Sequence, residues 1–335
     1  MERLLADCHL HFEGSLPEPV VRGLARDAGH PFSEPAAFAA RRRAVRDAAG
    51  FLELFAEVCR LFRSPEQYRD AAAAVAHGLG ADGLAYAEVY VSPEIFAKIG
   101  LDSAACVEAI DAGFEEAARS GGADCRILLD TVRHWGPDAA SRVLDGHERN
   151  PRPRVVGFGM GGDEASFPAS AFAGAYARAR DLGLKTSVHA GEWLGPDSVR
   201  EALDALRPDR LDHGIRAAAD AGLLARLAAD DTALCVAPVG NVVTGAASSL
   251  ADHPLPRLLE AGVAVSLSAD DPLLFGTTTA NEYETASRAF ALSEDVLRTM
   301  ARRAWRCAFG VSPARRDAAV AALASWPAQS GGSTS

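Results

Sequence analysis

The chain begins with a short apolar run that ends in two histidines, "LLADCHLHFEGSLP" from Leu4, with His9 and His11 one residue apart. In a β-strand, residues i and i+2 point to the same face, so two imidazoles at this spacing can bind one metal ion. The same pattern arises by chance, or from buried histidines that hydrogen-bond to their neighbours. The metal interpretation therefore depends on where other ligand-type residues occur along the chain.

Eight short apolar, β-branched runs recur along the chain, separated by segments with the 3.6-residue periodicity of helices. Strands that alternate with helices predict an α/β fold with parallel pairing, and eight repeats are the count of a (β/α)8 TIM barrel. A doubly wound open sheet is the alternative, but it usually has a glycine-rich loop after its first strand, where this chain has H-x-H. The runs lie at residues 3–10, 84–91, 125–132, 154–160, 184–190, 209–214, 233–238 and 262–270.

One connection is much longer than the others, because no strand signal occurs between Phe12 and Gly83. We predict a helical insertion after the first strand, over residues 12–83. Within it, "FLELFAEVCRLF" (Phe51–Phe62) places apolar side chains on one helical face, and a helix over the barrel mouth could wall a pocket. Residues 1–325 are expected to form one metal-dependent hydrolase domain, followed by a disordered tail at 326–335.

Ligand-type residues gather at the predicted carboxyl ends of the strands, where barrels of this class carry their functional groups. Random placement would scatter them over helices and loops, so this clustering favours a metal site. The first strand ends in His9 and His11, the fifth in His189 and Glu192, the sixth in His213, and the eighth in Asp270 and Asp271.

Three imidazoles and one carboxylate suit Zn²⁺ best among the common ions. Such a zinc acts in catalysis when it keeps a position for water. Glu192 is then a candidate proton shuttle, with a solvated loop acid as the alternative. His213 could orient or deprotonate the water, with a core histidine as the alternative. The predicted ligands are His9, His11, His189 and Asp270.

Charge and composition limit the partners. A net charge of −11 argues against a nucleic acid or an anionic membrane as the main partner. No apolar run reaches the ~18 residues of a membrane span, and the first residues lack the layout of a signal peptide. The six cysteines are scattered without a C-x-x-C pair, which favours reduced thiols. We expect a cytoplasmic protein with a small-molecule partner, and its oligomeric state stays open.

Five motifs, "HLHFEGSL", "GGDE", "HAGE", "DHG" and "SADDP", occur in this order and resemble the adenosine deaminase family of the metal-dependent amidohydrolase superfamily. The similarity runs from about Leu4 to about Phe309. It implies a zinc barrel that hydrolyses the 6-amino group of a purine to a 6-oxo group and releases ammonia, with one Zn²⁺ per chain on the four predicted ligands.

The resemblance also implies individual roles at the substrate. Glu192 would protonate a purine ring nitrogen, His213 would assist the attacking water, and Asp271 would hydrogen-bond the other edge of the purine. The base would meet the backbone of Gly162. The substrate would also border His11 and, on its sugar side, Glu13.

The chain departs from the family pattern at several positions. Gly240 stands where the family has a serine, and Cys235 where an acid is common. Those groups normally help to hold the histidine of the sixth strand, so the orientation of His213 is in question. Tyr90 stands where many adenosine-specific members have arginine, and Glu13 where adenosine deaminases commonly have aspartate.

The sequence indicates the substrate less directly than it indicates the reaction. The H-x-H-x-E-G pattern is common in members that act on adenine or other 6-aminopurines, whereas "LLDTVRHWGP", "GMGGDE" and "AWRCAF" resemble the branch acting on 6-aminodeoxyfutalosine. We expect a 6-aminopurine nucleoside, adenosine or a 5′-modified adenosine, since "GGDE" and "TGA" follow the nucleoside-acting pattern. The alternatives are adenine deaminase, another mononuclear amidohydrolase, and a non-catalytic binding protein. A two-metal enzyme with a bridging lysine is disfavoured, because the only lysines are Lys98 and Lys185.

Overall fold

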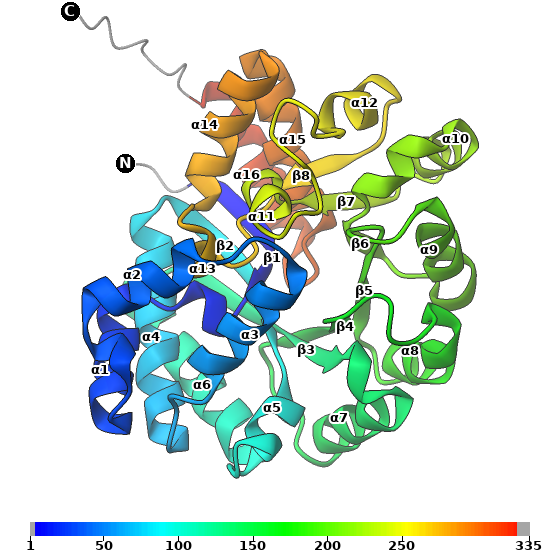
Figure 1. The fold of residues 1–335 in the computed structure, drawn as a ribbon. Coiled ribbons are helices and arrows are strands. Elements are labelled where there is room, and N and C mark those ends of the chain that lie inside the picture. The colour runs from blue at the N-terminus through cyan, green and yellow to red at the C-terminus, as the bar shows by residue number, and fades with distance from the viewer. Residues whose placement is uncertain (1–3, 327–335) are drawn as a thin grey trace, which may run out of the picture.

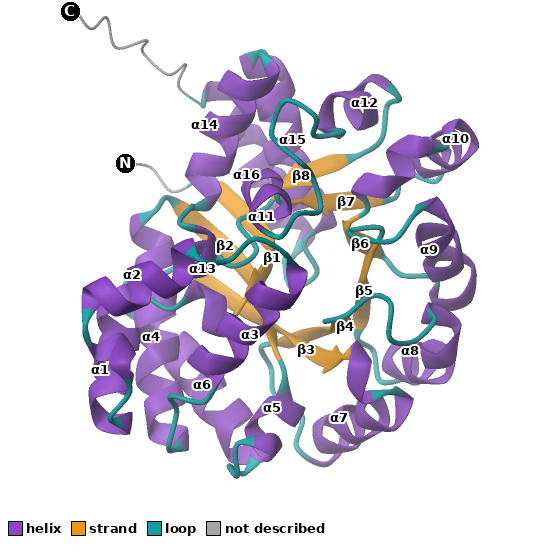
Figure 2. Ribbon diagram, viewed as in Figure 1, coloured by secondary structure: helices purple, strands orange, loops and turns teal. Residues whose placement is uncertain are grey.

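The computed structural model describes residues 4–326, in which eight parallel strands form a nearly closed barrel ringed by helices (Figure 1). Figure 2 shows the strands as an inner ring and the helices outside it. Each predicted run forms a strand, which confirms the (β/α)8 fold. The strands are β1 (Leu5–His11), β2 (Leu84–Val91), β3 (Asp124–Val132), β4 (Val155–Gly161), β5 (Lys185–Ala190), β6 (Arg210–His213), β7 (Ala233–Val236) and β8 (Val265–Leu267).

The barrel is completed at its carboxyl end by residues that follow β8. The Asp270 N–H donates to the carbonyl of His9 (3.1 Å), and the His11 N–H donates to the carbonyl of Asp270 (2.9 Å). The buried Asp7 carboxylate accepts the N–H groups of His9 (3.0 Å) and Ala269 (2.9 Å). Two predicted ligands, far apart in sequence, are thus held side by side by backbone hydrogen bonds.

Helices follow each strand, and four of them precede β2, as predicted for the long connection. They are α1 (Glu18–Ala28), α2 (Pro35–Arg43), α3 (Ala48–Cys59), α4 (Pro65–Ala81), α5 (Pro93–Lys98), α6 (Ser103–Arg119), α7 (Pro137–Arg149), α8 (Ala173–Asp181), α9 (Pro196–Glu201), α10 (Ala221–Ala229), α11 (Pro238–Val243), α12 (Leu255–Glu260), α13 (Pro272–Phe275), α14 (Thr279–Phe290), α15 (Glu294–Cys307) and α16 (Pro313–Ala322).

The amphipathic helix of the insertion is shorter than its apolar pattern. α3 ends at Cys59, so Leu61 and Phe62 lie beyond it, although both are buried. The Phe62 ring stacks on Tyr68 of α4, with ring centroids 3.8 Å apart. This contact stabilises a chain that leaves the helix after Cys59 and turns into α4. Tertiary packing therefore sets the end of α3.

The predicted tail lies mostly outside the described residues. Trp326, its first residue, packs edge-on against Tyr283 with ring centroids 5.5 Å apart, and 327–335 are not described. Among residues 4–326, no helix is both long and apolar enough to cross a membrane.

A buried carboxyl joins α14 to α11 behind the carboxyl ends of β7 and β8. Glu282 has no exposed surface, accepts the Val239 N–H (3.1 Å) and accepts the Thr277 hydroxyl (2.8 Å). Burial is the largest cause of its raised pKa, which moves from an ordinary value of 4.5 to about 8. The folded protein therefore holds this proton over a range in which the unfolded chain releases it.

Glu282 should make the protein less stable as the pH rises. Its stabilising contribution is complete below about pH 4.5 and is lost as the pH approaches 8, because the folded state binds more protons in that range. One pKa unit corresponds to ~1.4 kcal/mol, so the loss is on the order of a few kcal/mol. We expect Glu282→Gln, whose amide can serve both hydrogen bonds without charge, to flatten this slope in denaturant unfolding measured from pH 5 to 9.

The matched control is Glu284→Gln on the same helix, because Glu284 is part-exposed and pairs with Arg288 (3.2 Å). It should keep the slope of the unchanged protein. Parallel slopes for Glu282→Gln and the unchanged protein would contradict the assignment.

Candidate active site

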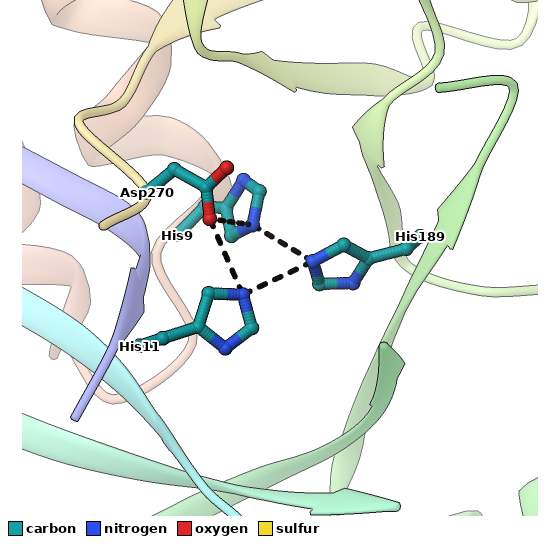
Figure 3. A group of neighbouring side chains, drawn as sticks. All are labelled: His9, His11, His189 and Asp270. Carbon is teal, nitrogen blue, oxygen red and sulfur yellow. Dashed lines mark hydrogen bonds and ion pairs between the residues drawn. The ribbon is translucent and has the colours of Figure 1, made fainter. Parts of the chain in front are cut away.

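Four ligand-type side chains converge at the carboxyl end of the barrel (Figure 3). His9 and His11 come from β1, His189 from β5, and Asp270 from the segment after β8. The Nε2 atom of His189 lies 3.0 Å from Nε2 of His9 and 3.2 Å from Nε2 of His11. Asp270 Oδ1 lies 3.3 Å from each of the β1 imidazoles.

These separations fit a metal ion. Four donors at zinc–ligand distances of ~2.0–2.2 Å in a tetrahedron lie about 3.3–3.5 Å apart, close to the values above, and all four donor atoms lie within 4.8 Å of one another. The donor set of three imidazoles and one carboxylate also suits zinc. The structure brings together the four predicted ligands, which can hold a metal ion.

Hydrogen bonds from other groups orient these ligands. His189 Nδ1 lies 2.9 Å from the carbonyl oxygen of Met160. Since a carbonyl only accepts, Nδ1 carries the proton and Nε2 turns its lone pair towards the cluster. The Tyr90 ring stacks on His11 with centroids 5.1 Å apart, and its hydroxyl donates to Asp212, a carboxylate 3.9 Å from His9 Nδ1. Tyr90 thus supports the site through its contacts with His11 and Asp212.

Two residues of the site have unusual backbone conformations. Asp270 and His213 both have φ of 61°, in the left-handed region, which non-glycine residues rarely occupy. Such strain costs on the order of 1–3 kcal/mol per residue and persists where the surroundings fix the chain. Here the backbone bonds of Asp270 to β1 supply that constraint.

A cavity of about 290 Å³ opens beside the cluster. Its outer wall comes largely from α3, as predicted for the insertion. The deep end carries the titratable groups, and Gly162 of the loop after β4 also lines it. The residues that line the cavity include Phe51, Leu52, Phe55, Ala56, Arg60, Ser92, Lys98, Asp130, Gly162, His189, Glu192, His213, Asp270 and Asp271.

Glu192 is suited to donate a proton. It is 3% exposed, accepts the Thr244 hydroxyl (3.4 Å) and lies 3.4 Å from His213 Nε2. Burial, followed by the negative charge of Asp270, raises the pKa of Glu192 well above its ordinary value. The carboxyl faces the cavity, where it can take part in proton transfer to a ligand.

Asp271 has the other available carboxyl. It is 1% exposed, and neither of its side-chain oxygens has a hydrogen-bond partner among the described residues. Burial, followed by the charge of Asp270, raises the pKa of Asp271 well above its ordinary value. Gly14 lies directly against it, and any Cβ at that position would collide with the carboxyl. Because it lines the cavity without a partner, Asp271 is available to a bound ligand.

Glu164 anchors the loop that carries Glu192. It is the last residue of the "GGDE" motif but was not among the predicted site residues. The buried Glu164 carboxylate accepts the N–H groups of Gly191, Trp193 (2.9 Å) and Leu194 (3.0 Å). Gly191 has φ of 67°, so the tight turn of "HAGE" suits glycine. Three converging N–H groups fix the chain on both sides of the proposed acid.

Asp130 at the end of β3 was also missed. It is 3% exposed, lines the cavity, and accepts the Ser92 hydroxyl through Oδ2 (2.6 Å), while Oδ1 has no hydrogen-bond partner within residues 4–326. Burial raises the pKa of Asp130. Its position as a carboxylate at a strand end was the signal that could have identified it.

Glu13 is placed differently from the other predicted residues. It lies in a 3-10 turn after β1, is 2% exposed, and is not among the cavity-lining residues. Burial raises the pKa of Glu13 to about 7. The geometry gives no support to a contact between this carboxyl and a sugar.

His213 is held despite the departures at Gly240 and Cys235. Asn241 of α11 lies with Nδ2 3.1 Å from His213 Nδ1. A side chain at position 240 would press on the Phe275 ring, which explains glycine where the family has serine. The thiol of Cys235 instead faces a hydroxyl of β8 at 3.4 Å. A different group thus orients the histidine.

The fold and the cluster define a barrel hydrolase of the metal-dependent amidohydrolase class. The sequence model named "Adenosine deaminase" matches residues 5–322, and the chain belongs to the adenosine deaminase family. It is a hydrolase acting on carbon–nitrogen bonds of amidines.

Three similar proteins illustrate the match. An adenine deaminase of Rhizobium meliloti (strain 1021) is 37% identical over 310 residues, covering 92% of this chain and 95% of that protein. The crystal structure of an adenine deaminase from Arthrobacter aurescens is 28% identical, with a TM-score of 0.91 over 97% of this chain and 99% of that one. A Burkholderia ambifaria amidohydrolase with bound Zn is 25% identical, with a TM-score of 0.88 over 96% and 89% of the two chains.

These names bear on the predicted substrate. The sequence motifs favour a 6-aminopurine nucleoside, whereas the Rhizobium and Arthrobacter relatives are named for adenine. The deaminase family is confirmed, and the alternative of adenine deaminase fits the comparisons better than the nucleoside prediction.

Proposed function

We propose that this chain is a zinc-dependent adenine deaminase that converts adenine and water to hypoxanthine and ammonia. The observation that carries the proposal is a single cavity whose deep end holds the metal-ligand cluster together with two buried carboxyls of raised pKa, Glu192 and Asp271. Adding water to a purine carbon breaks aromaticity, and this arrangement supplies a proton and a hydrogen-bond acceptor at separate edges of a flat base.

Each residue then has a definite task. The Glu192 carboxyl gives its proton to a ring nitrogen, which makes the neighbouring amino-bearing carbon electrophilic. Asp271 binds the opposite edge of the base, and the backbone of Gly162 lies beside it. His213 contacts the attacking water. The attacking water gives one proton to the amino group, the carbon–nitrogen bond breaks and ammonia leaves, and the second proton of the water returns to the Glu192 carboxylate.

A Zn²⁺ held by His9, His11, His189 and Asp270 would lower the pKa of the attacking water and stabilise negative charge on its oxygen. The zinc-bound Burkholderia neighbour and the separations of the donor atoms support zinc over other ions.

Two features support the free base over a nucleoside. The carboxyl predicted to meet a ribose, Glu13, does not line the cavity, and α3 covers that side with Phe51, Leu52, Phe55 and Ala56. The cavity is also at the small end of the ~300–1,000 Å³ typical of ligand sites. A sugar would bring hydroxyls against an apolar wall, at a cost for each unpaired group.

The substrate is tested by ammonia release from adenine, adenosine, AMP and 6-aminodeoxyfutalosine. We expect kcat/KM for adenine to exceed that for each nucleoside by at least about 10²-fold, since the nucleosides leave polar groups unpaired. The control is the zinc-loaded Glu192→Gln protein, which should release ammonia at least about 10²-fold more slowly from each of them.

A nucleoside as the best substrate would return the assignment to the initial prediction. AMP as the best substrate would point to the two cations that line the cavity, Arg60 and Lys98, as a phosphate site. A cytoplasmic location and a small-molecule purine partner remain predictions.

A further inference from the structure

Three groups behind His213 form with it a continuous line of hydrogen bonds. The backbone N–H of Leu255 lies 3.1 Å from Nδ1 of His253. Nε2 of His253 lies 3.2 Å from Oδ1 of Asn241, and Nδ2 of Asn241 lies 3.1 Å from Nδ1 of His213. The line begins at the start of α12, passes through α11 and ends at the tip of β6.

The first member of this line can only donate, which fixes the direction of every later bond. Because a backbone N–H has no lone pair, Nδ1 of His253 must accept, and its ring proton is then on Nε2. That proton is donated to Asn241, whose interacting atom must be its oxygen. The amide nitrogen of Asn241 therefore faces His213 and donates to its Nδ1.

This direction leaves one protonation pattern for His213. An Nδ1 atom that accepts from an amide cannot carry a proton, which excludes both the Nδ1–H tautomer and the doubly protonated ring. The proton of His213 is on Nε2, the atom that lies 3.4 Å from Glu192 and 3.8 Å from Asp270. Both neighbours are carboxyl oxygens, which suit a donor.

We propose that Asn241 and His253 are positioning residues that lock His213 in its Nε2–H tautomer, so that His213 donates a hydrogen bond to the attacking water and does not take its proton. Of the two roles left open for this histidine, orienting and deprotonating the water, the line of hydrogen bonds selects the first. His213 transfers no proton, so its role leaves the proton count of the reaction unchanged.

Burial keeps this line of hydrogen bonds rigid. Asn241 has no exposed surface, His213 is 1% exposed and His253 is 3% exposed, so water cannot replace a member of the line without cost. The Asn241 N–H also donates to the carbonyl of Ala237 (2.8 Å), and its carbonyl accepts from Ala247 (2.8 Å), which holds the residue at both ends. The arrangement explains how His213 stays oriented when glycine and cysteine replace the usual supports.

The tautomer is tested directly by nitrogen NMR of protein labelled with ¹⁵N in its histidine rings. Protonated and bare ring nitrogens differ widely in chemical shift, and the His213 signals are assigned by their loss in His213→Gln. We expect a bare Nδ1 and a protonated Nε2 at neutral pH, in the metal-free and the zinc-loaded protein. A protonated Nδ1 in the unchanged protein would overturn the proposal.

Asn241→Asp is the matched variant, because it keeps the shape of the side chain and replaces the donor by an acceptor. We expect the His213 proton to move to Nδ1, and kcat for ammonia release to fall about 10²- to 10³-fold, the usual effect of losing one preorganised donor, with zinc content unchanged. An unaltered tautomer in a folded Asn241→Asp protein would also overturn the proposal.

The second pair of variants tests His253. His253→Gln can still donate to Asn241 and should retain the tautomer and most of the activity, whereas His253→Leu should allow the amide to rotate and give mixed His213 tautomers. Equal spectra for the two variants would contradict the role of His253. The consequence for the reaction rests on the proposed function, but the tautomer does not. Failure of adenine as a substrate would leave the NMR result standing.

Discussion

Glu192→Gln is expected to retain one zinc per chain and to bind adenine, while kcat falls about 10²- to 10⁴-fold, the usual contribution of a general acid. The amide is nearly the same size as the acid but has no proton to give to a ring nitrogen. Burial and the charge of Asp270 raise the pKa of Glu192 well above its ordinary value, the direction that favours a proton donor. Steady-state ammonia release, metal analysis and calorimetric binding of adenine give the three readouts.

The matched control is Glu260→Gln, since Glu260 is exposed at the end of α12. It should leave kcat unchanged. If Glu192→Gln instead lost zinc, and its remaining activity fell in proportion to the remaining metal, Glu192 would be a ligand and the reaction scheme would be wrong.

His189→Ala is expected to lose zinc and activity together. His189 Nε2 lies within 3.2 Å of the donor atoms of both other imidazoles, and loss of a metal ligand leaves a coordination position that the protein cannot refill. Zinc affinity should fall by more than the 10- to 100-fold that is typical when a residue supporting a ligand is lost. Chelator competition measures the affinity, and ammonia release measures the activity.

His77→Ala is the control, because His77 is an exposed histidine of α4 whose ring contacts Ser120. It should match the unchanged protein in both readouts. A His189→Ala protein with full zinc occupancy and full turnover would remove the basis of the site assignment.

The barrel could be predicted because its evidence is local. Each strand is a short apolar run, and the rule that parallel strands end at the same edge brings His9, His189 and Asp270 together before any coordinates exist. The end of α3 could not be predicted, because the stacking of Phe62 on Tyr68, and not the apolar pattern, decides where the helix stops.

The supporting residues of the site were missed for the same reason. Glu164 and Asn241 act through side-chain hydrogen bonds to residues distant in sequence, and no periodic pattern reports such a bond. Glu13 differs from the other predicted residues: its place two residues after a ligand suggests a carboxyl in the cavity, whereas it lies in the 3-10 turn after β1 and is not among the lining residues. The spacing of residues predicts which way their side chains point only within the strand, and β1 ends at His11, before Glu13.

The backbone of Asp270 pairs with that of Leu10 and so joins the segment after β8 to β1. The side chain of Asp270 is one of the four metal-ligand donors. An ion bound to both Asp270 and His9 would therefore act as a removable cross-link between the start of the chain and a segment near its end. Its release on unfolding links stability to metal concentration: at 100 times the dissociation constant, a bound ion stabilises by ~2.7 kcal/mol. The concentration of free zinc would then set the free energy of unfolding as well as the rate of the reaction.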